Sequence, residues 1–146
     1  MKNNKIQRVV ILGANSFIAK SAIKHLRKEK VKIIKVSRKL IDFHNKNSVK
    51  KLKIIVKQND IVFLSAAKAP VKNISMLNYN MTIIANIVES LKNINLKQFI
   101  YLSSDAVYKD SLKLINENSI CEPDSLHGLM HLAREKYLKS IYLDKI

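Results

Sequence analysis

The chain has 146 residues and a formal net charge of +16, because 27 lysine and arginine residues outnumber 11 acidic residues. The length predicts one domain that spans residues 1–146, and an apolar fraction of 47% excludes a disordered basic tail. The single cysteine, Cys121, excludes an internal disulfide framework and a cysteine-based zinc site.

Lysine dominates the positive charge, which argues against a nucleic-acid site. Of the 27 basic residues, 23 are lysines scattered along the chain, whereas base readout and phosphate clamping favour arginine. Isoleucine and asparagine are also abundant. Lysine, isoleucine and asparagine all have AT-rich codons, so a compositional drift of the genome explains the abundance of all three. We expect a solvated lysine-coated surface, with nucleic acid, anionic small molecules and an acidic partner as the weaker alternatives.

The apolar segments are short. No apolar run approaches the roughly 20 residues that a membrane-spanning helix needs. The run at residues 9–12 is too short for the core of a signal peptide and is followed at once by Gly13. We therefore expect a cytoplasmic protein without a membrane partner.

Short apolar runs alternate with stretches in which apolar residues recur every three or four positions. The runs predict strands at residues 9–12, 31–36, 40–43, 61–64 and 99–102. The periodic stretches predict helices at residues 16–29, 49–56 and 75–93, and a last one from Pro123 onward, which Asp124 or Ser125 can cap. This alternation predicts an α/β fold with a parallel sheet and right-handed crossovers.

The turn after the first strand is the first candidate for a ligand site, because ligands of parallel sheets bind beyond the carboxyl ends of the strands. It lies between a predicted strand and a predicted helix, which is the context of a dinucleotide fingerprint. Backbone N–H groups at the start of that helix would face a pyrophosphate. The candidate residues for this contact are Gly13, Asn15, Ser16, Phe17 and Ile18.

Six segments stand in order along the chain, at residues 13–19, 40–43, 63–67, 80–86, 101–108 and 123–135. Together they resemble the extended short-chain dehydrogenase/reductase family, which includes sugar-nucleotide epimerases, dehydratases and reductases. The resemblance runs from about Lys5 to Leu138. In order, it implies the glycine turn at 13–19, the adenine-contacting acid at Asp42, the cofactor-lining strand at 63–67, the helix motif from Asn80 to Asn86, the active-site strand at 101–108, and the stretch of the Tyr-x-x-x-Lys pair at 123–135.

The resemblance implies a Rossmann-like, doubly wound parallel sheet in three αβα layers, with about five strands. It also implies that the chain holds the cofactor-binding part of such an enzyme without the C-terminal substrate domain. The cofactor-binding residues that it implies are Gly13, Asn15, Ser16, Phe17, Ile18, Arg38, Asp42, Phe63, Ala66, Ala67 and Asn80.

The glycine turn departs from the family pattern at two positions. Ser16 and Ala19 stand where the second and third glycines are expected. Alanine at the third position only crowds the packing of helix on strand, whereas Ser16 places a side chain where backbone approaches phosphate. The hydroxyl of Ser16 is a candidate hydrogen-bond donor to that phosphate.

The tip of the second strand bears on the choice of cofactor. NAD sites place an acid there for the ribose 2′-hydroxyl, but residues 36–39 contain none. Arg38, together with Lys39, can instead meet a 2′-phosphate. We therefore expect NADP in preference to NAD, with two solvated basic residues at a turn as the alternative.

The catalytic positions implied by the resemblance are Ser104, His127 and His131. Ser104 aligns with the catalytic serine or threonine, and Ala106 after Asp105 leaves the acid pair of a dehydratase incomplete. His127 and His131 stand where the family has tyrosine and lysine. Histidine titrates near neutral pH, so His127 is a candidate general base, whereas His131 is shorter than lysine and a poor substitute for it.

The same two histidines have the i, i+4 spacing of zinc ligands. The glutamate of the His-Glu-x-x-His motif is absent, however, and no third ligand is evident, so we expect no metal.

Two classes of function follow from these residues. The first is an NAD(P)-dependent epimerase or reductase that acts on a nucleotide sugar and needs a partner chain, for which a second copy in a homodimer is one candidate. The second is a dinucleotide-binding module without catalysis, or a decayed fragment of such an enzyme.

Overall fold

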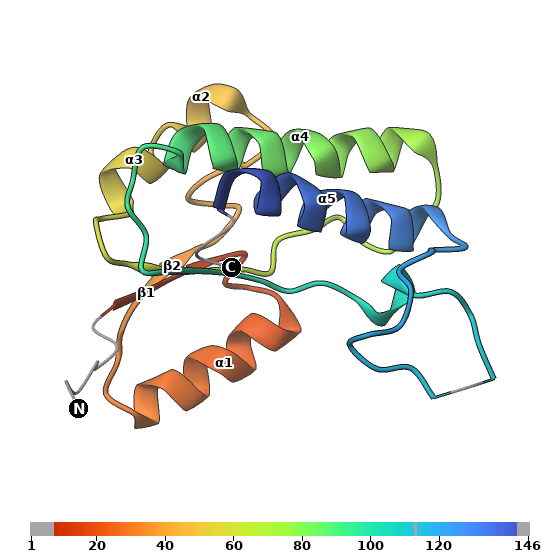
Figure 1. The fold of residues 1–146 in the computed structure, drawn as a ribbon. Helices are drawn as coiled ribbons and strands as arrows, with labels where there is room; N and C mark the ends of the chain where they lie inside the picture. The colour runs from red at the N-terminus through yellow and green to blue at the C-terminus, as the bar shows by residue number, and fades with distance from the viewer. Residues whose placement is uncertain (1–7, 113, 143–146) are drawn as a thin grey trace.

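The computed structural model describes residues 8–112 and 114–142, which form a parallel sheet between two layers of helices (Figure 1). Within these residues the sheet has four strands in the order β2-β1-β3-β4. The strands are β1 (Arg8–Leu12), β2 (Lys32–Val36), β3 (Ile61–Leu64) and β4 (Gln98–Tyr101). The order and the parallel pairing confirm the predicted Rossmann-like α/β fold.

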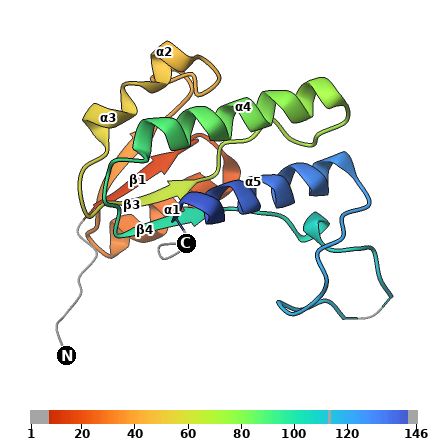
Figure 2. The same ribbon diagram turned by 45° about the horizontal axis from the view of Figure 1, so that its top comes forward.

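The helices make the other two layers. Helix α1 (Phe17–Lys28) covers one face of the sheet, and α4 (Ile74–Leu91) and α5 (Leu126–Tyr142) lie side by side on the opposite face (Figures 1 and 2). No helix among residues 8–112 and 114–142 is both long enough and apolar enough to span a bilayer.

The prediction of a strand at residues 40–43 is wrong. The backbone turns there, because the N–H groups of Leu40 and Ile41 both donate to the carbonyl of Ser37. Ile41 and Phe43 are buried in the core while Leu40 is half exposed, so a turn produces the alternation that is typical of a strand. The single helix expected at 49–56 is likewise two short ones, α2 (Lys46–Val49) and α3 (Leu52–Ile55).

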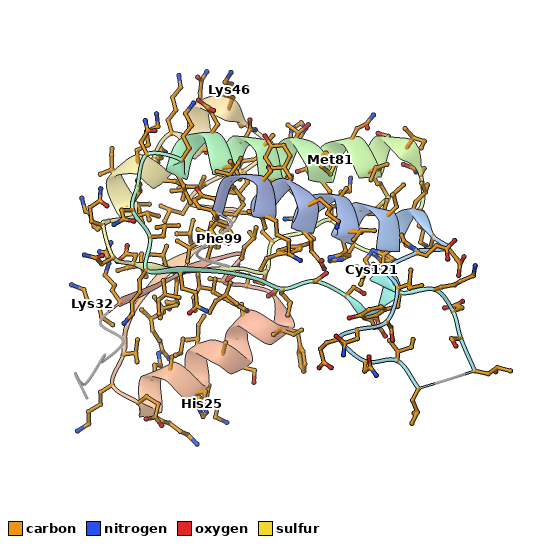
Figure 3. The ribbon with its side chains drawn as sticks, in the orientation of Figure 1. His25, Lys32, Lys46, Met81, Phe99 and Cys121 are labelled. Carbon is orange, nitrogen blue, oxygen red and sulfur yellow. The ribbon has the colours of Figure 1, made fainter. Side chains whose placement is uncertain are left out.

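The larger core lies between the sheet and the layer of α4 and α5. Val10 and Leu12 of β1 pack there with Phe99 of β4, which Figure 3 shows in the interior between sheet and helices. Val9 and Ile11 point to the opposite face and pack under α1. The central strand β1 is thus buried on both faces, as its continuous apolar run predicts, and each such side chain contributes roughly 1.5–3 kcal/mol.

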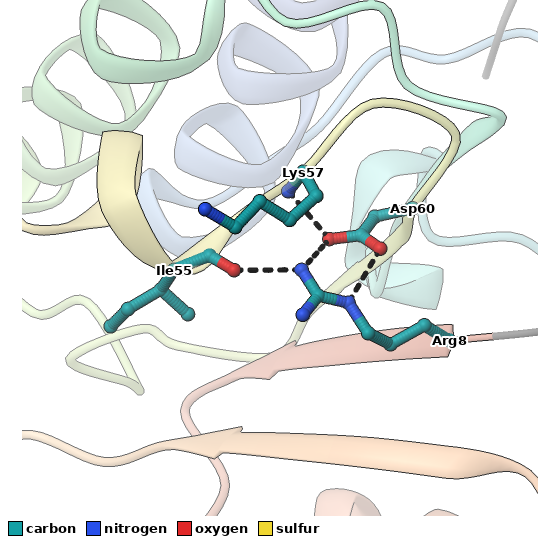
Figure 4. Close-up of polar contacts among 4 residues, drawn as sticks. All are labelled: Arg8, Ile55, Lys57 and Asp60. Carbon is teal, nitrogen blue, oxygen red and sulfur yellow. Dashed lines mark hydrogen bonds and ion pairs between the residues drawn. The ribbon is translucent and has the colours of Figure 1, made fainter.

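An ion pair ties the amino ends of β1 and β3 together (Figure 4). The guanidinium of Arg8 donates from Nε to Oδ1 of Asp60 at 2.7 Å and from Nη2 to Oδ2 at 2.6 Å. Nη2 also donates to the carbonyl of Ile55, and Asp60 accepts from the N–H of Lys57. The hydrogen bond with Asp60 raises the pKa of Arg8. This pair lies at the amino ends of the strands, whereas the predicted ligand site lies beyond their carboxyl ends.

Candidate functional site

Two cavities lie beyond the carboxyl ends of the strands. The first measures about 310 Å³ and the second about 520 Å³. Four residues line both cavities, namely Ser16, Ser65, Ala66 and Ala67. The two cavities therefore adjoin beyond the carboxyl ends of the strands.

The predicted cofactor residues fall mostly into these cavities. The first is lined by Gly13, Asn15, Ser16, Arg38, Asp42, Ala66 and Ala67, and the second by Ser16, Phe17, Ile18, Ala66 and Ala67. Phe63 lines neither, because its side chain packs against the core under α1. Asn80 is buried beneath the site and lines neither cavity.

Gly13 makes the turn after β1 possible. Its φ of 92° lies in the region that favours glycine, and a Cβ there would lie 2.7 Å from the backbone nitrogen of Ala66. The N–H groups of Gly13 and Ala14 both donate to the carbonyl of Val36, at 2.9 and 3.1 Å. The turn is thereby held close to the ends of both neighbouring strands.

Ser16 ends this turn and caps α1. Its hydroxyl oxygen accepts from the N–H of Ala19 at 3.1 Å, and its proton goes to the hydroxyl of Ser65 at 3.0 Å. The Ser16 hydroxyl, which the sequence suggests as a donor to a phosphate, thus already donates to Ser65 within the protein. The first helical N–H groups, those of Phe17 and Ile18, have no acceptor within the helix, and both residues line the second cavity.

Two asparagines of α4 hold the loops that wall the first cavity. The Asn80 amide accepts from the N–H of Lys68 at 2.8 Å and donates to the carbonyl of the same residue at 3.0 Å. Asn86 donates to the carbonyls of Phe43 and His44. The motif at 80–86 therefore positions the loops after β2 and β3. Asn80 does not line the cavity itself but holds the backbone of Lys68, which does.

Five residues that line the first cavity were not predicted as site residues, and Lys68 and Tyr79 are two of them. The ring of Tyr79 stacks on His44 at 4.2 Å, and the Nζ of Lys68 lies 5.1 Å from the centre of the same ring. Tyr79 and Lys68 line the cavity together with Arg38, so two cations face it. Tyr79 directly precedes Asn80, but nothing in its pattern distinguishes it from a core tyrosine.

The three predicted catalytic residues all line the second cavity. The Ser104 hydroxyl accepts from the N–H of Ala106 and donates to Oδ1 of Asp105 at 3.1 Å, at the start of the short helix η1 (Asp105–Val107). The rings of His127 and His131 lie edge to face, 4.7 Å apart. The spacing of i and i+4 therefore does bring both imidazoles to one face of α5.

Gly128 lets the start of α5 approach η1. A Cβ at this position would lie 1.9 Å from the carbonyl oxygen of Ala106. The helix is capped by Ser125, whose hydroxyl accepts from the N–H of Gly128 at 3.1 Å, as the sequence predicts. This close packing brings His127 and Ser104 to the same cavity.

A buried cluster lies under the two histidines. The hydroxyl of Tyr101 is 2.7 Å from Nδ1 of His131, and the guanidinium of Arg134 lies 5.0 Å from the centre of the Tyr101 ring. Arg134 is completely buried and donates to the carbonyl of Ala66 at 2.9 Å, while its Nε has no partner. Tyr101 and Arg134 were not predicted, although Arg134 shares the helical face of His127 and His131.

Burial sets the protonation of this cluster. It raises the pKa of Tyr101 to about 12, a shift that the charge of Arg134 opposes. It lowers the pKa of His131 to about 4, and repulsion by His127 and Arg134 adds to this shift. His131 is therefore neutral and Tyr101 is protonated at pH 7. No three histidine, cysteine or acidic side chains in the described part of the chain gather as metal ligands.

Solved structures of known proteins share this fold. A dTDP-4-dehydrorhamnose reductase from Clostridium acetobutylicum superposes with a TM-score of 0.80 and 21% identity over 95% of this chain and 51% of that one. The same enzyme from Bacillus anthracis, in complex with NADP, gives 0.79 and 23% over 95% and 51%. UDP-glucose 4-epimerase from Thermus thermophilus, in complex with NAD, gives 0.77 and 17% over 92% and 50%.

The chain spans about half the length of these solved structures. No curated protein matches it by sequence. A family model, however, matches residues 9–143, in agreement with the motifs in the sequence. The chain therefore belongs to the NAD dependent epimerase/dehydratase family.

Proposed function

We propose that the chain is an NAD(P)-binding domain, spanning residues 1–146, that holds a dinucleotide along the two adjoining cavities. The observation that carries this proposal is their shared wall, because Ser16, Ser65, Ala66 and Ala67 line both. One elongated ligand can thus run from Arg38 in the first cavity to His131 in the second. A dinucleotide has that shape, and the family binds one.

Each part of a dinucleotide finds a counterpart among the lining residues. The first N–H groups of α1 suit the pyrophosphate, and the absence of a Cβ at Gly13 leaves room for the turn to lie against Ala66. Asp42 suits the adenine amino group, and Arg38 suits a 2′-phosphate. With Lys68 as a second cation in the same cavity, NADP is favoured over NAD.

For the reaction, we propose reduction or epimerisation of a nucleotide sugar. The nicotinamide supplies or accepts a hydride when it is bound. His127 then holds or releases the proton of the substrate hydroxyl, and the Ser104 hydroxyl hydrogen-bonds the same oxygen, since both line the second cavity. The sugar-binding part is proposed to come from a partner chain, of which a second copy of this chain is one candidate. A cytoplasmic location stays a prediction.

A binding module without catalysis is the second candidate. One observation favours it, because the residues described around the second cavity include no lysine, and His131 is already engaged with Tyr101. Such a module would keep the cofactor site and lack proton transfer. Converting both histidines to the tyrosine and lysine of the family, as His127→Tyr with His131→Lys, would distinguish the two. Hydride transfer should then appear only in the double variant if catalysis has been lost.

Calorimetric titration tests the common claim of both candidates. NADPH and NADH are compared with 2′,5′-ADP, which lacks the nicotinamide half. We expect micromolar binding of NADPH, weaker binding of NADH, and intermediate affinity for 2′,5′-ADP because it fills only the first cavity. No heat of binding at millimolar NADPH and NADH would contradict both candidates.

A further inference from the structure

The hydrogen bond between Tyr101 and His131 has a defined direction. A phenol is the stronger acid and an imidazole nitrogen the stronger acceptor, so the hydroxyl of Tyr101 donates to Nδ1 of His131 across 2.7 Å. The reverse arrangement would leave the phenolic proton without an acceptor among the described residues. Burial keeps both partners neutral, as the raised pKa of Tyr101 and the lowered pKa of His131 indicate.

The tautomer of His131 follows from this direction. A neutral imidazole carries one N–H group, and because Nδ1 accepts, that proton is on Nε2. His131 lines the second cavity, and within the described part of the chain its Nε2 has no hydrogen-bond partner. The ring thus offers one unused donor at the cavity.

We propose that His131 is a neutral Nε2–H donor to a hydroxyl or carbonyl oxygen of the ligand in the second cavity, and that Tyr101 is the positioning residue that selects this tautomer. The proposal deepens the proposed function and rests on it for the identity of the ligand. The resemblance places lysine at position 131, and His131 offers a donor there without the positive charge.

The surrounding groups support a neutral ring. Arg134 lies beneath Tyr101 and is fully buried, so its charge opposes a second charge on His131. His127, on the same helix, acts in the same direction. Glu135, the nearest acid of α5, hydrogen-bonds Ser103 of the segment after β4. The residues that α1 and the loop after β3 contribute to this cavity carry no charge.

An uncharged donor has a different preference from that of an ammonium group. A neutral N–H bonds well to a hydroxyl or carbonyl oxygen and gives no special attraction for a phosphate. The strength of the hydrogen bond from His131 to the ligand should also be insensitive to salt, since no charge is involved. The part of the second cavity at His131 is therefore suited to the nicotinamide ribose or a sugar hydroxyl, and the pyrophosphate is left to the first N–H groups of α1.

The tautomer can be measured without any ligand. Long-range ¹H–¹⁵N correlation spectra of the full ¹⁵N-labelled chain at pH 7 distinguish a protonated from a bare imidazole nitrogen, and His131→Gln assigns the signal. We expect a bare Nδ1 and a protonated Nε2 for His131, and a mixture of both tautomers in Tyr101→Phe. A protonated Nδ1 in the unmodified chain, or an unchanged tautomer in Tyr101→Phe, would overturn the proposal.

A second arm measures the donor itself. His131→Gln keeps an amide N–H on a side chain of similar length, whereas His131→Leu removes every donor. We expect the Kd of NADPH to rise roughly fivefold in His131→Leu and to change little in His131→Gln. Equal affinities of wild type and His131→Leu would overturn the donor role. Absence of dinucleotide binding in the wild type would defeat the proposed function, while the spectra would still decide the tautomer.

Discussion

The hydroxyl of Ser16 donates a 3.0 Å hydrogen bond to the hydroxyl of Ser65 and so joins the turn after β1 to the end of β3. Ser65 in turn lies 3.2 Å from the carbonyl of Gly13, to which its hydroxyl donates. Both serines line both cavities, so their contact lies at the point where the two cavities meet. The family pattern has glycine at position 16, where this chain has a side chain that caps the helix and braces the turn.

Replacing Ser16 with glycine should strengthen dinucleotide binding and weaken the fold. Ser16→Gly opens the approach of a phosphate to the turn, so we expect the Kd of NADPH to fall severalfold. Loss of the cap and of the bond to Ser65 should cost about 1 kcal/mol of unfolding free energy. Titration and urea denaturation measure the two effects. Ser16→Ala, which keeps the Cβ, is the control and should lose stability without gaining affinity.

Adding a side chain at Gly13 should destabilise the protein. In Gly13→Ala, the positive φ and the 2.7 Å approach of the new Cβ to the nitrogen of Ala66 should together cost about 3 kcal/mol, seen as a lower urea midpoint. A harmless Gly13→Ala would contradict the tight turn.

The opposite exchange is available at Lys30, which follows α1 with a φ of 55°. Lys30→Gly should raise the free energy of unfolding by roughly 0.5–1 kcal/mol.

Arg38 should discriminate between the two cofactors. It lines the first cavity, whereas its neighbour Lys39 does not. Arg38→Ala removes a charge-assisted contact to the 2′-phosphate, so the Kd of NADPH should rise roughly tenfold while that of NADH stays the same. Lys39→Ala is the matched control and should alter neither value. An equal loss for both cofactors would mean that Arg38 does not read the 2′-phosphate.

His131 should make the protein sensitive to acid. Its pKa is lowered to about 4 from an ordinary value of 6.5, so the unfolded chain binds a proton that the folded chain does not bind. Between these two pH values the free energy of unfolding therefore falls as pH falls, and below about pH 4 this contribution becomes constant. Urea midpoints from pH 7 to pH 4 should show a shallower slope for His131→Gln than for the wild type. Parallel slopes would refute a neutral buried imidazole.

The strands that are buried on both faces were predictable from the sequence. Residues 9–12 and 61–64 are continuous apolar runs, and the structure has β1 and β3 there. The segment at 40–43 misled the same reasoning, because Ile41 and Phe43 are buried by a turn after β2. An alternating pattern indicates which side chains are buried, but it does not indicate whether the backbone pairs with a neighbouring strand.

The site was predictable as a set of segments but not as a network of contacts. The family motifs indicate Gly13, Ser104 and His131, and the structure has all three at the two cavities. The partner of His131 comes from a strand 30 residues away, and no local pattern connects them. Arg134 was not singled out in the sequence, because its burial arises from contacts with Tyr101 of β4 and Ala66 after β3, which are far from it along the chain.

The most direct test of the dinucleotide site is a map of amide chemical-shift changes when NADPH is added to the ¹⁵N-labelled chain. We expect changes at Gly13 and Ala66 around the first cavity and at Ser104 and His131 around the second, in one saturable transition. The lysine-bearing helices α2 and α3, which line neither cavity, should not respond. No change at saturating NADPH, or changes confined to those helices, would contradict a dinucleotide held along the two cavities.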